Sequence, residues 1–187
     1  MPSVKKILRF LILISIPLFI PGCLTCERKE YVFNLTGPNS GKLTIKYVNI
    51  FSSLIDSTGE LSSDYDELAS MWLNGEKLEL DFPGAKNFRK RLFKENGSLC
   101  GEVSMEFDDI SKVRVYRNKG KGPFMLNISD VNDDGEIYSQ GNGKFGGEKM
   151  PVISWPENTK TLKFTTKIAA PDSTTVSMLN MWENRKD

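Results

Sequence analysis

The sequence contains no histidine among its 187 residues. A serine–histidine–aspartate triad, a cysteine–histidine pair and an HExxH zinc site all require histidine, so these catalytic sites are excluded. Cysteine is scarce, with 3 residues. Neither sign of charge dominates, since the chain has 25 basic and 24 acidic residues. Such a balance gives no general attraction to nucleic acid. With 39% hydrophobic and 26% charged residues, the composition is that of an ordinary globular domain.

The carboxylates most suited to acid–base work are adjacent in turn-like sequence, at Asp64, Asp66 and Glu67 and again at Asp108 and Asp109. Acid–base pairs act instead from separate elements held at a defined distance. We therefore expect a protein that is not an enzyme.

Long hydrophobic runs are also lacking, and the N-terminal one is short. Phe10–Ile20 is an apolar run of 11 residues that follows the basic residues Lys5, Lys6 and Arg9. A transmembrane helix needs about 20 apolar residues. A basic start, a short apolar stretch and a small residue before a cleavage point predict a secretory signal over residues 1–22. Its removal takes three basic residues, which leaves 22 of the 25 against 24 acidic ones and a net charge of −2.

The signal ends in Ile20-Pro21-Gly22-Cys23, which resembles the lipobox of bacterial lipoproteins. The resemblance implies cleavage before Cys23, acylation of that cysteine, for example with palmitate, and a lipid-anchored protein of the cell envelope at the outer membrane. The alternative is a plain secretory signal with a soluble mature chain.

Lipidation of Cys23 would leave Cys26 and Cys100 as a pair. In an exported protein this favours a disulfide between them. The alternative is two separate thiols.

Most of the remaining chain alternates apolar and polar residues between turn signals, as half-buried β-strands do. The alternating segments lie near residues 31–33, 43–47, 78–82, 103–107, 113–116, 124–128, 162–168 and 176–182. One segment differs: Tyr65, Leu68, Ala69 and Trp72 have helical spacing, which predicts one short helix near residues 64–73. We expect a mainly β fold, a single antiparallel β-sandwich or open barrel. Residues 23–29 would form a lipidated tether and 30–187 a single β-rich domain.

An acidic segment resembles the first part of an EF-hand-like calcium loop. Asp130, Asn132 and Asp134 would supply side-chain oxygens and Glu136 its backbone carbonyl. Position twelve is Gly141 and not a bidentate glutamate, so any Ca²⁺ binding should be weak. The alternative is an acidic hairpin tip that uses Asp and Gly for turn geometry.

A dense basic segment lies just before the middle of the chain, with Lys86, Arg89, Lys90 and Arg91. It is a candidate binding site for an acidic partner, a polyanion or lipid headgroups. The alternative is the solvated face of a strand or helix whose interleaved apolar residues belong to the core.

These features favour a non-enzymatic binding or assembly component of the cell envelope, with a lipid anchor in the membrane and an envelope protein as partner. A second hypothesis depends on Leu78–Gly84 and Gly101–Asp109. These segments resemble the central strands of the short sandwich lipoproteins of type VI secretion systems, which implies a role in tethering a membrane complex to the outer membrane. A third hypothesis is a surface adhesin or ligand-binding module that uses the calcium loop or the basic segment.

Overall fold

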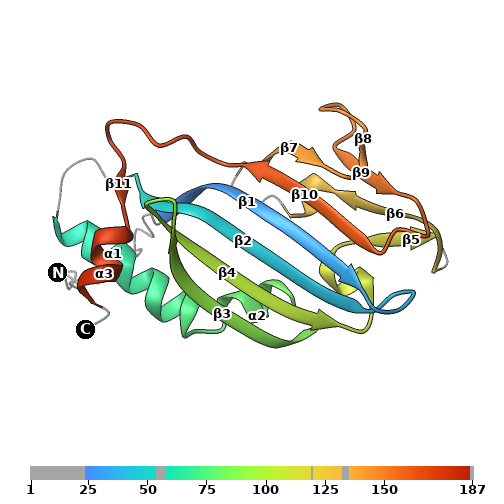
Figure 1. Ribbon diagram of the computed structural model, residues 1–187, viewed down its shortest axis with the longest axis horizontal. Helices are drawn as coiled ribbons and strands as arrows, with labels where there is room; N and C mark the ends of the chain where they lie inside the picture. Colours follow the sequence, from blue (N-terminus) through green and yellow to red (C-terminus); the bar gives the residue numbers. More distant parts are fainter. Residues whose placement is uncertain (1–23, 54–57, 119, 132–134, 186–187) are drawn as a thin grey trace, which may run out of the picture.

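The computed structural model describes residues 24–53, 58–118, 120–131 and 135–185. The fold is mainly β, and every strand pairing is antiparallel, as predicted. Figure 1 shows one long, twisted sheet whose two ends are covered by different layers, a small sheet at one end and helices at the other.

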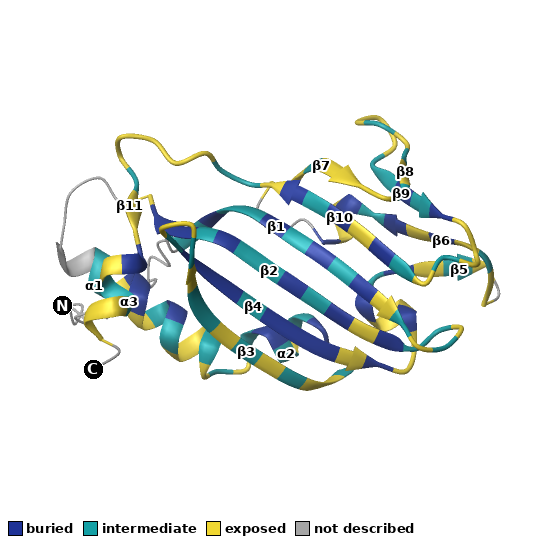
Figure 2. Ribbon diagram, in the orientation of Figure 1, coloured by how far each residue is buried: buried dark blue, intermediate teal, exposed yellow. Residues whose placement is uncertain are grey.

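The larger sheet has seven strands in the order β3-β4-β2-β1-β10-β7, with the short β11 paired to the end of β2. Its strands are β1 (Leu24–Leu35), β2 (Gly41–Ser52), β3 (Ala85–Glu95), β4 (Ser98–Phe107), β7 (Ile137–Gly141), β10 (Thr161–Lys167) and β11 (Val176–Ser177). Buried and exposed residues alternate along the central strands, so one face of this sheet lies inside the molecule (Figure 2). We call this the inner face.

Tight turns set the register of the longest strands. β3 and β4 are joined by Asn96-Gly97, between the paired residues Glu95 and Ser98. Asn96 and Gly97 have φ values of 51° and 79°. Positive φ at both central residues is what a type I′ turn requires, and its twist matches that of the strands.

A smaller sheet packs on the inner face at the end remote from the first residues of β1. Its four strands, in the order β5-β6-β9-β8, are β5 (Tyr116–Asn118), β6 (Lys121–Asn127), β8 (Lys144–Phe145) and β9 (Val152–Trp155). Phe33, Leu43 and Phe164 of the large sheet share one buried cluster with Phe124 and Trp155 of the small sheet. This is the core of the predicted sandwich.

Helical segments cover the other end of the inner face. They are α1 (Thr58–Glu67), the π-helical η1 (Leu68–Leu73), α2 (Lys77–Asp81) and α3 (Leu179–Asn184), and the 3₁₀ turns η2 (Ile110–Val113) and η3 (Ile128–Asp130) lie elsewhere. Tyr65, Leu68 and Leu179 form a second buried cluster with Cys26 and Ile50 of the sheet. Asp64 accepts a 2.5 Å hydrogen bond from Ser52, which attaches α1 to β2.

The predicted helix near 64–73 lies within α1 and η1, and four other predictions need correction. The strands expected near 113–116 and 176–182 are largely replaced by η2, which ends at Val113, and by α3 at Leu179–Asn184. Residues 24–29, expected to form a polar tether, are the first half of β1, with Cys26 and Lys29 buried. Leu78, Leu80 and Phe82 were expected in a strand, but residues 77–81 form α2. Leu78 and Phe82 are buried one helical turn apart, whereas Leu80 is 74% exposed.

Candidate functional site

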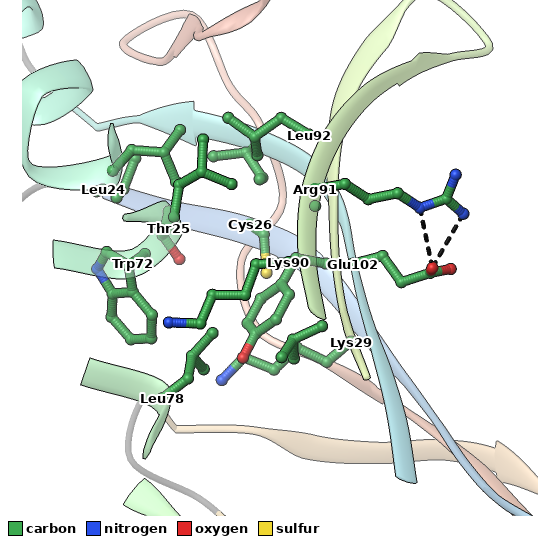
Figure 3. A pocket seen from close by; sticks show the side chains of 16 residues that line it. Leu24, Thr25, Cys26, Lys29, Trp72, Leu78, Lys90, Arg91, Leu92 and Glu102 are labelled. Atoms are coloured by element: carbon green, nitrogen blue, oxygen red, sulfur yellow. Dashed lines mark hydrogen bonds and ion pairs between the residues drawn. The ribbon is translucent and has the colours of Figure 1, made fainter. Parts of the chain in front are cut away.

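An apolar pocket lies between the inner face of the large sheet and the helices (Figure 3). It encloses about 90 Å³. The first residues of β1 form one wall, and η1 and α2 form the opposite wall. It is lined by Leu24, Thr25, Cys26, Lys29, Tyr47, Ile50, Leu68, Trp72, Leu73, Leu78, Lys90, Arg91, Leu92, Gly101, Glu102 and Val103. We call it the sheet–helix pocket. Concave apolar sites with a few polar groups are where proteins most often bind small ligands.

Glycine at position 101 leaves room on the sheet side of the pocket. A Cβ atom there would lie 3.3 Å from Ile50 Cδ1 and 3.5 Å from Leu92 Cδ2. A methyl group is therefore tolerated after a small shift of flexible side-chain ends, and a larger side chain would extend into the pocket.

The cationic residues that line the pocket each have a carboxylate partner. Lys90 Nζ donates to Glu79 Oε2 at 2.7 Å and to the Gly75 carbonyl at 2.6 Å. Arg91 points away from the pocket, to the other side of the strands, and binds Glu102 (Figure 3). Lys29 Nζ lies 2.7 Å from Glu136 Oε1. Because these charges are compensated locally, the pocket favours an uncharged apolar ligand over an ion.

A second, more polar cavity of about 160 Å³ adjoins the first. The two share Lys29, Tyr47, Trp72 and Leu78 as lining residues. The polar side chains that line the second cavity include Lys77, Asp81 and Arg114.

Glu136 is the most deeply buried charged group at the junction of the layers, with a side chain that is 0% exposed. Tyr31 donates a hydrogen bond to it (3.0 Å to Oε2), and Thr166 donates another at 2.5 Å. With Lys29 this gives three donors around one carboxylate, which compensates for its loss of hydration. Burial, and next the charge of Glu136, raise the pKa of Tyr31 well above its usual value. Burial likewise raises the pKa of Tyr47.

The basic segment predicted to bind a partner does not form one surface. Lys90 points inward to the pocket, whereas Arg91 lies on the outer face, because successive residues of β3 alternate. Lys86 forms an exposed ion pair with Asp108 at 2.6 Å. Arg89 is exposed opposite Ser104 of β4. Partner binding by this segment stays a prediction, now limited to Lys86, Arg89 and Arg91.

The predicted calcium loop lies partly outside the described residues, which include neither Asn132 nor Asp134. Asp130 is exposed at the end of η3, and its carbonyl accepts a hydrogen bond from Arg114. The Glu136 carboxylate is held inside the fold, so a bound ion could use only its backbone carbonyl, as the prediction stated. Within the described ranges, no group of three or more Cys, Asp or Glu residues is placed to hold a metal ion. Calcium binding stays a prediction.

The predicted disulfide is not present in this structure, where Cys26 and Cys100 are separate buried side chains. Cys26 is on β1 and Cys100 on β4, and β2 lies between these strands. Strands are about 4.8 Å apart, so the two Cα atoms are separated by roughly 10 Å, beyond the about 7 Å that a disulfide spans. Cys26 also lines the pocket, whereas alternation with Gly101 directs Cys100 to the outer face.

Cys23 and the rest of the predicted signal peptide lie outside the described residues. Lipidation at Cys23 therefore stays a prediction. In the part of the chain that the structure describes, no helix has the length and apolar character needed to cross a membrane.

Sequence reasoning missed the pairing of Lys29 with Glu136 and the pocket. A signal for the first existed, since Lys29, Tyr31 and Phe33 alternate along β1 and a charged residue in an inward series needs a buried partner. The pocket had no comparable signal, because its walls come from β1, β2, β3, β4, η1 and α2.

The first of the two segments compared with type VI lipoproteins is helical at Lys77–Asp81, whereas Ser98–Phe107 is a strand. Only the second segment, Gly101–Asp109, therefore still resembles a central strand of the type VI lipoproteins. Comparisons of the whole chain with protein-family models, with curated proteins and with solved structures found no match.

Proposed function

We propose that this chain is a lipid-anchored protein of the cell envelope, located at the outer membrane. It works by binding and not by catalysis. The sheet–helix pocket is its binding site, and the ligand is an uncharged apolar molecule or segment. The anchor is proposed from the basic residues, the apolar run and the lipobox-like ending at Cys23.

The observation that carries this proposal is the pocket itself, apolar on the sheet and helix sides and with its lining cations paired to carboxylates. Filling such a space with a ligand removes apolar surface from water, worth about 25 cal/mol per Å². The absence of histidine from the sequence is in keeping with a non-catalytic role.

The test is binding of N-phenyl-1-naphthylamine, an uncharged apolar fluorophore. The protein is the full chain with Cys23→Ser, so that no lipid competes with the probe. The parent should bind with saturable enhancement of fluorescence. Gly101→Leu, which fills the pocket, should weaken binding roughly tenfold or more, equal to about 1.4 kcal/mol.

Gly101→Ala is the matched control, because its methyl group comes nearest to two movable side-chain ends, Ile50 Cδ1 and Leu92 Cδ2, and leaves most of the pocket open. It should bind like the parent. Thr25→Phe fills the pocket from β1 and replaces Gly101→Leu if that variant does not unfold cooperatively. Equal binding by the parent and by a folded, pocket-filled variant would contradict the proposal.

A further inference from the structure

The first residues of β1 form part of the wall of the sheet–helix pocket. Leu24, Thr25 and Cys26 of β1 all line it. Consecutive Cα atoms are 3.8 Å apart, so Cys23, the proposed lipidation site, is one residue away from the pocket wall. β1 already pairs with β2 at Leu24, the residue that follows Cys23 in the sequence.

The chemistry of the pocket matches that of a hydrocarbon chain. Its walls are built from Leu24, Ile50, Leu68, Trp72 and Leu92, and the Lys90 ammonium near them is bound by Glu79 and the Gly75 carbonyl. The pocket needs no ligand charge to balance its own, and burying a charged lipid headgroup there would be costly. An alkyl segment is apolar and uncharged, so it fits the pocket.

We propose that the sheet–helix pocket is the docking site for an acyl chain of the lipid carried on Cys23 of the same molecule. This inference rests on the proposed lipid anchor and on the proposed use of the pocket, and it names the ligand. A chain attached at residue 23 is present at an effective concentration on the order of millimolar or higher, so it outcompetes free apolar molecules.

The energetics allow this exchange. A methylene group gains about as much on entering an apolar protein site as on entering the bilayer, so the exchange is close to balanced for the part of the chain that the pocket holds. The remaining chains keep the protein on the membrane. An apolar cavity of about 150 Å³ holds benzene, so the 90 Å³ here accommodates part of one acyl chain and not all of it.

The experiment uses the full chain made in bacteria that carry out lipidation, fed with palmitate bearing a diazirine and an alkyne. Envelope vesicles are irradiated, the protein is purified, and cross-linked peptides are mapped by mass spectrometry. Cross-links from the lipid on Cys23 should fall on the pocket wall, in residues 68–78 and 90–92. They should be retained in Gly101→Ala and lost in Gly101→Leu or Thr25→Phe, with incorporation of the label unchanged.

The outcomes separate this inference from the proposed function. A labelled wild type whose cross-links reach only phospholipids or surfaces outside the pocket would overturn it, while probe binding by Cys23→Ser would keep the pocket as a ligand site. Equal labelling of wild type and Cys23→Ser would overturn both the anchor and this inference. Cross-links in the pocket that Gly101→Leu does not reduce would also contradict it.

Discussion

Lys29 and Glu136 are 107 positions apart in the chain, yet Lys29 Nζ and Glu136 Oε1 lie 2.7 Å apart. The Lys29 side chain is 11% exposed and the Glu136 side chain 0%. The pair joins β1 to the end of the acidic segment that precedes β7. It thereby holds this segment against the large sheet, beside the cavity that adjoins the sheet–helix pocket.

The first prediction concerns this pair. Glu136→Gln removes the carboxylate from a buried ion pair, so the free energy of unfolding should fall by about 3–5 kcal/mol. Urea unfolding followed by circular dichroism measures this. The double variant Lys29→Met, Glu136→Leu should recover only part of the loss, because it removes both charges but also removes the acceptor of the Tyr31 and Thr166 hydroxyls.

Lys86→Met is the control, since it breaks the exposed pair with Asp108 and should leave the urea midpoint almost unchanged. If Glu136→Gln were as harmless as Lys86→Met, the pair would not be buried in solution.

The second prediction is a loss of stability at alkaline pH. Burial and the Glu136 charge raise the pKa of Tyr31, whereas tyrosine in the unfolded chain titrates near 10.0. The folded protein keeps this proton where the unfolded chain has lost it. The Tyr31 contribution is therefore constant below about pH 9, and it declines as the pH rises through about 10 and above. Urea midpoints between pH 8 and 11 (an approximate range) test this.

Tyr31→Phe should make the decline above about pH 10 shallower. It should also lower stability at neutral pH, because the Glu136 carboxylate loses a buried donor. Tyr116→Phe, at an exposed tyrosine, should leave the pH dependence as in the wild type. Parallel profiles for Tyr31→Phe and the wild type would show that another group causes the decline.

The third prediction is lipidation at Cys23. Labelled palmitate should enter the wild-type protein and be absent from Cys23→Ser, whose unprocessed precursor should accumulate. Cys26→Ser, three residues later in the sequence and within β1, should be labelled like the wild type. Label retained in Cys23→Ser would contradict the lipobox resemblance.

The fourth prediction is weak calcium binding at residues 130–136. Calcium needs six to eight oxygen ligands, and the Glu136 carboxylate is bound to Lys29, Tyr31 and Thr166. We expect a dissociation constant on the order of 10⁻⁴–10⁻³ M, as in extracellular modules. Thermal unfolding should shift by a few degrees at millimolar calcium and very little at micromolar calcium.

Asp130→Ala should remove this shift and Asp108→Ala, at an exposed carboxylate outside the loop, should not. A strong stabilisation at micromolar calcium that Asp130→Ala abolishes would favour a calcium-dependent binding module instead.

The limits of sequence reasoning are clearest at Leu78, Leu80 and Phe82. Their spacing of two predicted a strand, yet Leu78 and Phe82 are also four apart, which suits one face of a helix. A strand and a helix would both place Leu78 and Phe82 on the same face, so the sequence does not choose between them, and the packing of α2 does. In the helix Leu80 lies on a different face, and it is 74% exposed.

The cysteines illustrate the same limit. Composition and export favoured a bridge between Cys26 and Cys100, but the order of strands in a sheet is a long-range property. The insertion of β2 between β1 and β4 separates the two side chains, and nothing in the local sequence around either cysteine indicates it.

By itself, the sequence determined the mainly β class, the helix near residues 64–73, the many turns and the exclusion of histidine chemistry. These follow from the local spacing of apolar and polar residues, from the conformations that Asn and Gly allow, and from composition. Only the tertiary structure decided the partner of Lys29, the helical state of α2, the separation of the cysteines and the pocket beside Leu24. Each of these depends on which distant segments pack together, and that is set by the arrangement of the whole chain.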